Sequence, residues 1–344
     1  MKRLLLADLH FTDNPLDDYR WKVFDWIKEI DEKYKFDYLY ILGDLTERKD
    51  RHSAQLVNRV VKELNNLWDE CGIEVVLLKG NHDFIDSDTP FFGFLKNNEH
   101  ISYVCKVDDN SHRNDDSELF LPYTATPDED WKDIDFSKYE RIYMHQSVIG
   151  SIANNGMEMK EGLPRDHRIF KECKGRIYSG HIHKSQTIDI DGCTFDYVGS
   201  PYPVYFGDKG DWKGLIMDSK GIVSTVLHPT ITRHMIDIGD VKELKKYSLK
   251  SGDQCKVRLK LHRTDNYMWT KYRDEIKEYI EKKGVQMVSL ELIPDKVESV
   301  VYSNNDSERV SGFSDIELIE QFSIREKLND GFMEVAKELV GLIG

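Results

Sequence analysis

Cysteine is scarce in this chain, and the cysteines that are present are not spaced as a redox or disulfide motif. There are five, all far apart, and none belongs to a Cys-x-x-Cys sequence (Cys71, Cys105, Cys173, Cys193 and Cys255). An odd number of scattered thiols does not form a disulfide framework. We therefore expect free thiols and a cytoplasmic, reducing location.

Long apolar runs are also missing. No run approaches the length needed to cross a bilayer, and residues 1–3 lead straight into an apolar strand and not into a signal peptide. There is no internal repeat or low-complexity tract. A hydrophobic content of 40% with 32% charged residues is typical of a globular protein, and 344 residues are too many for one ordinary core. We expect two domains with an appendage and no membrane association.

Positive charge is in deficit. The formal net charge is −14, which argues against a protein that coats nucleic acid by bulk attraction. A nucleic-acid enzyme stays open, because some of the carboxylates are themselves candidate ligands, and bound divalent cations would reverse the local field.

Strands and helices are predicted to alternate in the first part of the chain. Apolar runs end near residues 7, 42 and 78, and amphipathic helices are predicted between them, over residues 16–34 and after a Ser53 cap. This order implies parallel strands with right-handed crossovers. Hairpins are predicted over residues 187–198 and 214–227. Residues 107–118 are acidic and lack periodicity, which predicts a solvated loop.

A boundary is predicted near Pro229. Beyond it, residues 256–262 alternate strictly, a helix with apolar residues in register follows, and residues 285–292 form an apolar run. This order predicts a small β-α-β unit. The chain from residue 315 onward is predicted to be helical.

Five apolar runs end in side chains of the kinds that bind metal ions. Seven of these side chains are candidate ligands (Asp8, His10, Asp44, Asn81, His145, His181 and His183). They supply oxygen and nitrogen but no sulfur, which suits manganese, iron or zinc. Residues i and i+2 of an extended segment point the same way, so Asp8 with His10, and His181 with His183, can converge. Seven ligands exceed the needs of one ion and fit two ions that share a carboxylate and clamp a phosphate.

Taken in order, these motifs resemble the full series of the calcineurin-like metallophosphoesterase superfamily. The resemblance implies an α/β fold, a four-layer α/β/β/α sandwich with a dinuclear metal centre. Carried over position by position, it implies one ion on Asp8, His10, Asp44 and His183, and the other on bridging Asp44, Asn81, His145 and His181. It also implies that His82 contacts the scissile phosphate and acts as an acid, and that Asp83 orients His82.

A second stretch is similar to a narrower group. Residues 197–201, Tyr-Val-Gly-Ser-Pro, followed by Phe206-Gly207-Asp208, resemble the corresponding segment of SbcD-type recombination nucleases. The resemblance implies a nuclease domain over 1–228, a small α+β DNA-capping domain over 229–300, and a helical tail over 301–344 that binds an ATPase. It implies a manganese-dependent DNA exo- or endonuclease of an SbcCD-like repair complex, which hydrolyses phosphodiesters by a two-metal-activated hydroxide.

Two other functions stay open: a small-molecule phosphodiesterase or phosphomonoesterase on the same fold, and a non-catalytic scaffold. The SbcD-type resemblance implies DNA and an SbcC-type ABC ATPase as partners and allows a homodimer. In one respect the sequence departs from many of these nucleases, because Glu47 stands where they carry a second catalytic histidine.

Several residues are candidates for contacting the substrate (Arg48, Lys49, Arg51, His52, Tyr202 and Tyr205). Arg48, Lys49 and Arg51 are predicted to lie beside the metal site. The alternative for His52 is a helix-entry residue, and the alternative for the two tyrosines is buried packing. The basic face of residues 256–262 either follows a DNA backbone or is simply solvated.

Overall fold

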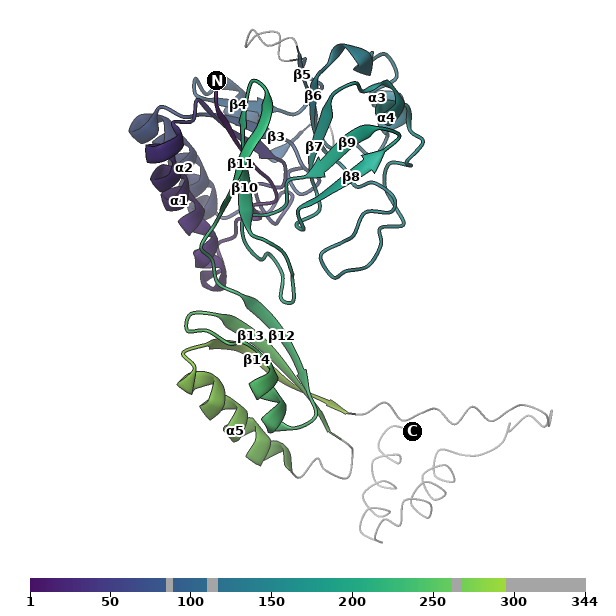
Figure 1. The fold of residues 1–344 in the computed structure, drawn as a ribbon. Coiled ribbons are helices and arrows are strands. Elements are labelled where there is room, and N and C mark those ends of the chain that lie inside the picture. The colour runs from purple at the N-terminus through teal and green to yellow at the C-terminus, as the bar shows by residue number, and fades with distance from the viewer. Residues whose placement is uncertain (85–88, 110–116, 262–267, 295–344) are drawn as a thin grey trace, which may run out of the picture. The chain divides into compact units, whose positions relative to one another are not determined.

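Parallel strands connected by helices form the first sheet of the molecule, as the sequence predicts. In the computed structural model, which describes residues 1–84, 89–109, 117–261 and 268–294, β1 (Arg3–Leu6), β2 (Tyr38–Leu42), β3 (Glu74–Leu78) and β4 (Ile101–Val104) run parallel (Figure 1). The predicted hairpin of β10 (Lys213–Asp218) and β11 (Gly221–Leu227) extends this sheet, whose order is β11-β10-β1-β2-β3-β4.

Three helical segments connect these strands. The predicted helix over residues 16–34 begins as a 3₁₀ turn, η1 (Pro15–Trp21), and continues as α1 (Lys22–Tyr34). α2 (Ala54–Cys71) begins at the predicted cap, since Ser53 Oγ accepts a hydrogen bond from the Leu56 amide at 3.1 Å. A further 3₁₀ segment, η2 (Phe91–Asn97), precedes β4.

The second sheet has five strands in the order β5-β6-β7-β9-β8. β5 (Glu118–Leu121), β6 (Arg141–His145), β7 (Arg176–Gly180) and β9 (Cys193–Tyr197) are parallel, and β8 (Gln186–Ile190) forms the predicted hairpin with β9. The short helical segments α3 (Pro127–Asp130), η4 (Phe136–Lys138) and α4 (Arg168–Glu172) accompany this sheet.

Three apolar clusters show that the two sheets face each other with helices outside. Leu4 and Leu6 of β1 pack with α1 and α2, whereas Leu5 packs with Tyr143 of β6 in a cluster between the sheets. Ile142, the neighbour of Tyr143, points the other way and packs with α4. Alternate residues of one strand therefore enter different layers, and the predicted α/β/β/α sandwich is confirmed (Figure 1).

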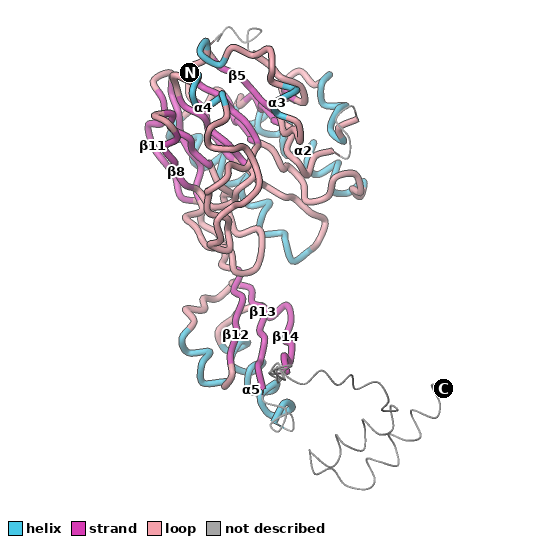
Figure 2. Tube along the Cα trace, turned by 90° about the vertical axis from the view of Figure 1, so that its right-hand side faces the viewer, coloured by secondary structure: helices cyan, strands magenta, loops and turns pink. Residues whose placement is uncertain are grey.

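A third, three-stranded sheet follows residue 229. β12 (Arg233–Ile238), β13 (Gln254–Leu261) and β14 (Gln286–Pro294) are parallel, and α5 (Trp269–Lys282) and the 3₁₀ segment η5 (Val241–Lys246) pack on them (Figure 2). The predicted β-α-β unit is present as β13, α5 and β14. β12 was not predicted from the sequence.

The predicted basic face of β13 is partly neutralised. Arg258 Nε is 2.6 Å and Lys260 Nζ is 3.5 Å from the Asp237 carboxylate. His262, the last member of that face, lies outside the described residues.

Contacts divide the chain into two units, Met1–Asp295 and Lys296–Gly344. The helical tail predicted over residues 301–344 lies outside the described residues, and the domain boundary near Pro229 stays a prediction. No helix in the described part of the chain is long and apolar enough to span a membrane.

The predicted solvated loop over residues 107–118 is wrong at its end. Glu118 begins β5 and is fully buried. Its carboxylate is 3.0 Å from Arg3 Nη2 and 3.0 Å from Arg141 Nε, and it accepts hydrogen bonds from the hydroxyls of Tyr40 and Tyr143. Two cations and two hydroxyls therefore compensate the burial of this carboxylate between the sheets.

Candidate metal centre

The seven predicted ligands lie at the carboxyl ends of strands from both facing sheets. The loops after β1, β2 and β3 carry four of them, and the ends of β6 and β7 carry the other three (Asp8, His10, Asp44 and Asn81; His145, His181 and His183). Because β1, β2 and β3 are parallel to one another, and β6 is parallel to β7, the ligands of each sheet gather at one edge.

Asp8, His10 and His183 form one half of this cluster. Their ligand atoms lie within 4.8 Å of one another, and all three side chains are buried. Asp44 Oδ2 is 3.5 Å from His10 Nε2. Asp8 Oδ2 and His10 Nε2 have no hydrogen-bond partner among the residues that the structure describes. Buried polar atoms without partners are costly, so this half fits a cation.

Asn81, His145 and His181 form the other half. Asn81 Oδ1 lies 2.9 Å from His145 Nε2 and 2.8 Å from His181 Nδ1, and Asp44 Oδ2 lies 3.4 Å from His145 Nε2. One amide oxygen and one carboxylate oxygen thus face imidazole nitrogens. Asp44 is close to both halves, which is the position of a carboxylate that two ions share.

Three of the histidines are oriented through the ring nitrogen that faces away from the centre. His145 Nδ1 is 2.7 Å from the Leu42 carbonyl oxygen, and His10 Nδ1 is 3.1 Å from Glu47 Oε2. His183 Nδ1 is 3.5 Å from Asp208 Oδ2. The contacts of His145 and His183 are hydrogen bonds that fix the ring, whereas His10 and Glu47 lie at ion-pair distance. In all three residues Nε2 is left for an ion, as with carbonyl and carboxylate partners at histidine metal sites.

Four of the seven residues have left-handed backbone conformations. The φ angles are 55° at Asp8, 46° at His10, 52° at Asp44 and 83° at His181. Such conformations cost of order 1–2 kcal/mol each for residues with a Cβ. Strain concentrated at these positions indicates that the fold holds the side chains where a function requires them.

Close approach explains two glycines of the motifs. A Cβ on Gly43, whose φ is +86°, would overlap the His145 ring, and a Cβ on Gly80 would overlap the Asp44 carboxylate. The loops after β2 and β3 therefore meet without space for a side chain.

The electrostatics of the centre also favour cations. Burial opposes ionisation of Asp44, but the His145 and His10 imidazoles outweigh it and hold the pKa of Asp44 well below its ordinary value. Burial would lower the pKa of His145, yet Asp44 raises it to about 9. Burial and the nearby His145 lower the pKa of His181 to about 3. The raised pKa of His145 favours a protonated imidazole beside the Asp44 carboxylate, and because metal ligands must be deprotonated, ion binding would release that proton.

Comparison with known proteins agrees with this geometry. Residues 1–185, more than half of the 344-residue chain, match the model of the calcineurin-like phosphoesterase family. The chain belongs to this family. It is therefore a phosphoesterase, and members of its family typically bind two divalent metal ions.

Solved structures similar to this phosphoesterase are distant in sequence. A dimetal phosphatase from Danio rerio is 13% identical with a TM-score of 0.37, over 68% of this chain and 99% of that one. Phosphopantetheinyl hydrolase from Mycobacterium tuberculosis is 13% identical with a TM-score of 0.31, over 58% and 90% of the two chains. No curated protein sequence matches the chain.

His82 lies at the edge of the phosphoesterase centre. Its ring centre is 4.8 Å from that of His10, its Nδ1 is 2.6 Å from the Glu47 carbonyl oxygen, and its backbone amide donates to Asp44 Oδ1 at 2.8 Å. Glu47 thus orients the ring through its backbone, and its own carboxylate contacts His10.

Asp83 does not orient His82, and that prediction is wrong. Its carboxylate accepts hydrogen bonds from the backbone amides of Asp44 at 2.9 Å, Leu45 at 3.0 Å and Gly80 at 2.7 Å. Burial and the Asp44 charge raise the pKa of Asp83 to about 7. Asp83 instead ties the loop after β2 to the loop after β3.

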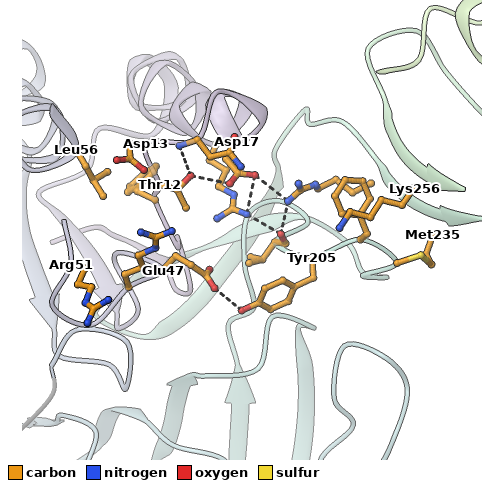
Figure 3. Close-up of a pocket in the computed structure, with 16 residues that line it drawn as sticks. Thr12, Asp13, Asp17, Glu47, Arg51, Leu56, Tyr205, Met235 and Lys256 are labelled. Atoms are coloured by element: carbon orange, nitrogen blue, oxygen red, sulfur yellow. Dashed lines mark hydrogen bonds and ion pairs between the residues drawn. The ribbon is translucent and has the colours of Figure 1, made fainter. Parts of the chain in front are cut away.

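Beside the centre lies a cleft of about 490 Å³ that contains some of the predicted substrate residues (Figure 3). Arg48 and Arg51 line it, and so does Tyr205, which is 45% exposed and donates its hydroxyl to Glu47 Oε1 at 3.1 Å. Lys256 of β13 lines the same cleft.

The other three candidates lie elsewhere. Tyr202 is fully buried and donates its hydroxyl to the Leu9 carbonyl at 2.6 Å, so its prediction as a base-stacking residue is wrong and the packing alternative holds. The His52 ring packs against Phe91 in a tilted orientation with ring centres 3.9 Å apart, and one of its ring nitrogens lies 2.7 Å from Thr46 Oγ1. Lys49 Nζ is 6.0 Å from the ring centre of Phe84.

Two residues near the centre were not predicted as site residues. The Tyr123 ring stacks on His181 with centres 6.1 Å apart, and Asp208 contacts His183. Tyr123 follows β5, a strand that was not predicted from the sequence. Asp208 belongs to the Phe206-Gly207-Asp208 segment, which resembles a segment of SbcD-type nucleases, but the resemblance gave Asp208 no role.

Proposed function

We propose that this phosphoesterase is a manganese-dependent DNA nuclease, the phosphodiesterase subunit of an SbcCD-like repair complex. The observation that carries the proposal is the cleft beside the metal centre, which Arg48 and Arg51 line from one side and Lys256 of the third sheet from the other. Basic side chains on two sides of a cleft suit a long polyanion, because each neutralised phosphate adds salt-dependent affinity.

The seven clustered side chains would hold the metal ions. One ion is assigned to Asp8, His10, Asp44 and His183, and the other to bridging Asp44 with Asn81, His145 and His181. The oxygen and nitrogen donors and the absence of a thiolate in this set support manganese. Two such ions, when bound, neutralise phosphate charge and activate water.

His82 is assigned the general acid. The Glu47 carbonyl accepts the Nδ1 proton of His82 at 2.6 Å, so the ring is held with Nε2 on the opposite side. In its protonated form the Nε2–H can donate to the phosphate and pass its proton to the leaving oxygen. Positioned general acids contribute typically 10²–10⁴-fold to the rate.

The experiment compares two substrates. Chelator-treated protein is reloaded with Mn²⁺ and assayed on linear duplex DNA and on bis(4-nitrophenyl) phosphate, alone and with an SbcC-type ATPase. The double variant Arg48→Ala/Arg51→Ala is expected to lose about tenfold in kcat/KM on DNA, with a log–log salt slope smaller by about 2. It should keep parental activity on the small ester. Lys171→Ala, an exposed lysine on α4, is the matched control and should resemble the parent on both.

Hydrolysis of the small ester with no cleavage of any DNA, even with the ATPase, would overturn the nuclease assignment and favour a small-molecule phosphodiesterase. Inactivity on both substrates with fewer than one Mn²⁺ per chain would favour a non-catalytic scaffold.

A further inference from the structure

Residues 204–208, here called the 204–208 segment, contact both histidines of one half of the metal centre. Asp208 Oδ2 is 3.5 Å from His183 Nδ1, and the Tyr205 ring stacks on His183 with centres 5.4 Å apart. The Tyr205 hydroxyl donates to Glu47 Oε1, and Glu47 Oε2 is 3.1 Å from His10 Nδ1. Any shift of this segment would therefore change the orientation of His10 and His183.

Arg233 of β12 contacts the 204–208 segment at three points. Its Nη1 donates to the Val204 carbonyl at 2.7 Å, and its Cζ lies 4.1 Å from the centre of the Phe206 ring. Its own carbonyl accepts a hydrogen bond from the Gly207 amide at 2.8 Å. The third sheet is thus connected to the segment that contacts the histidines.

Arg20 of η1 completes the arrangement from the phosphoesterase side. Its Nη2 donates to the same Val204 carbonyl at 2.9 Å, and its Nη1 donates to the His10 carbonyl. Asp17 Oδ1 lies 3.3 Å from Arg20 Nη2 and 3.2 Å from Arg233 Nη1 (Figure 3). All three charged side chains are buried. Replacing either arginine would therefore remove one of the two guanidinium partners that Asp17 and the Val204 carbonyl share.

We propose that Arg233 is a positioning residue for the metal centre, which sets the affinity for the ion assigned to Asp8, His10, Asp44 and His183. It acts through Asp208 on His183, and through Tyr205 and Glu47 on His10. The other half of the centre is held differently, because His145 is oriented by the Leu42 carbonyl and Asn81 faces both of its histidines. Arg233 therefore affects one ion and not the other.

The test is a calorimetric titration of chelator-treated protein with Mn²⁺, without substrate. The parent should bind two ions. Asp208→Asn should weaken one of them by 10–100-fold, the range typical for partners of metal-bound histidines. Arg233→Met should lower the affinity for the same ion by about tenfold and change the affinity for the other ion by less than twofold.

Arg258→Met is the matched control. Arg258 lies in the same three-stranded sheet and pairs with Asp237 at 2.6 Å, so this variant removes an arginine and an ion pair within the sheet. It should bind both ions as the parent does.

Parental affinity of Arg233→Met for both ions would overturn the proposal, and so would an equal loss at both sites, which indicates general loosening. If Arg233→Met does not unfold cooperatively, Arg233→Lys replaces it, because lysine keeps the charge but lacks the planar fork. A severalfold loss of affinity of Arg233→Lys for one ion supports the proposal, and parental affinity for both ions overturns it. The inference rests on the proposed ligand assignment. If the parent protein binds fewer than two Mn²⁺ ions, both the assignment and the inference are overturned. Failure to cleave DNA would affect only the nuclease proposal.

Discussion

Replacing His82 with asparagine separates its assigned chemistry from metal binding. The substitution leaves the backbone amide of residue 82 in place, and this amide is the group that donates to Asp44 Oδ1 at 2.8 Å. The imidazole itself contacts the Glu47 carbonyl and the edge of His10 and is not one of the seven assigned ligands. His82→Asn should therefore bind two Mn²⁺ ions with parental affinity.

We expect the substitution to lower the turnover rate. Loss of a positioned general acid lowers the rate by about 10²–10⁴-fold, which corresponds to about 3–5 kcal/mol of transition-state stabilisation. The alkoxide that leaves DNA needs a proton, whereas nitrophenolate leaves readily without one. We therefore expect kcat on linear DNA to fall by about 10³-fold and kcat on bis(4-nitrophenyl) phosphate to fall by less than tenfold.

Metal content by mass spectrometry and steady-state rates on both substrates check this prediction. Equal losses on the two substrates would refute the role of His82 as an acid, and loss of an ion would show that the ring supports the metal centre. Cleavage of DNA at the parental rate would remove His82 from the mechanism.

Three further predictions concern the scaffold around the site. Glu118→Gln should lower the free energy of unfolding in urea by about 3–5 kcal/mol, since it leaves buried arginines without their carboxylate; a loss below about 1 kcal/mol would contradict this. Gly43→Ala should abolish stoichiometric Mn²⁺ binding in equilibrium dialysis because its Cβ would overlap His145, whereas Gly192→Ala, with φ +84° and no atom within 4 Å of its Cβ, should bind as the parent does; equal binding by both would contradict the steric argument. Tyr202→Phe should cost about 1 kcal/mol in thermal unfolding by losing its hydrogen bond and leave KM for DNA unchanged; a raised KM without loss of stability would return Tyr202 to the substrate site.

The ligand cluster was predictable because the fold and the motif spacing constrain each other. The apolar runs before Asp8 and Asp44 become parallel strands of one sheet, and the run that ends in His145 becomes a strand parallel to β7 in the other sheet. The carboxyl ends of parallel strands lie at one edge of each sheet. The sequence pattern thus locates each side chain before any contact is known. The layers of the sandwich were implied by the resemblance to the metallophosphoesterase superfamily, and β1 and β6 fit them because both strands are buried on both faces.

Predictions failed where a side chain's partners come from segments that are distant in the sequence. Tyr202 and Tyr205 are three residues apart in a segment without periodicity, so no pattern separates the buried ring from the exposed one. The Asp83 carboxylate binds amides of the loop after β2, which a local motif does not reveal. Glu118 looks like a loop residue because its partner Arg3 lies far from it in the sequence, near the N-terminus.

Anomalous diffraction from crystals grown with Mn²⁺ and measured at the manganese edge tests the central claim most directly. The account predicts two peaks about 3.5–4 Å apart with the Asp44 carboxylate between them. One peak should be bounded by His10 and His183, and the other by His145 and His181. A single peak, or none beside Asp44, would contradict the two-ion centre on which the proposed chemistry depends.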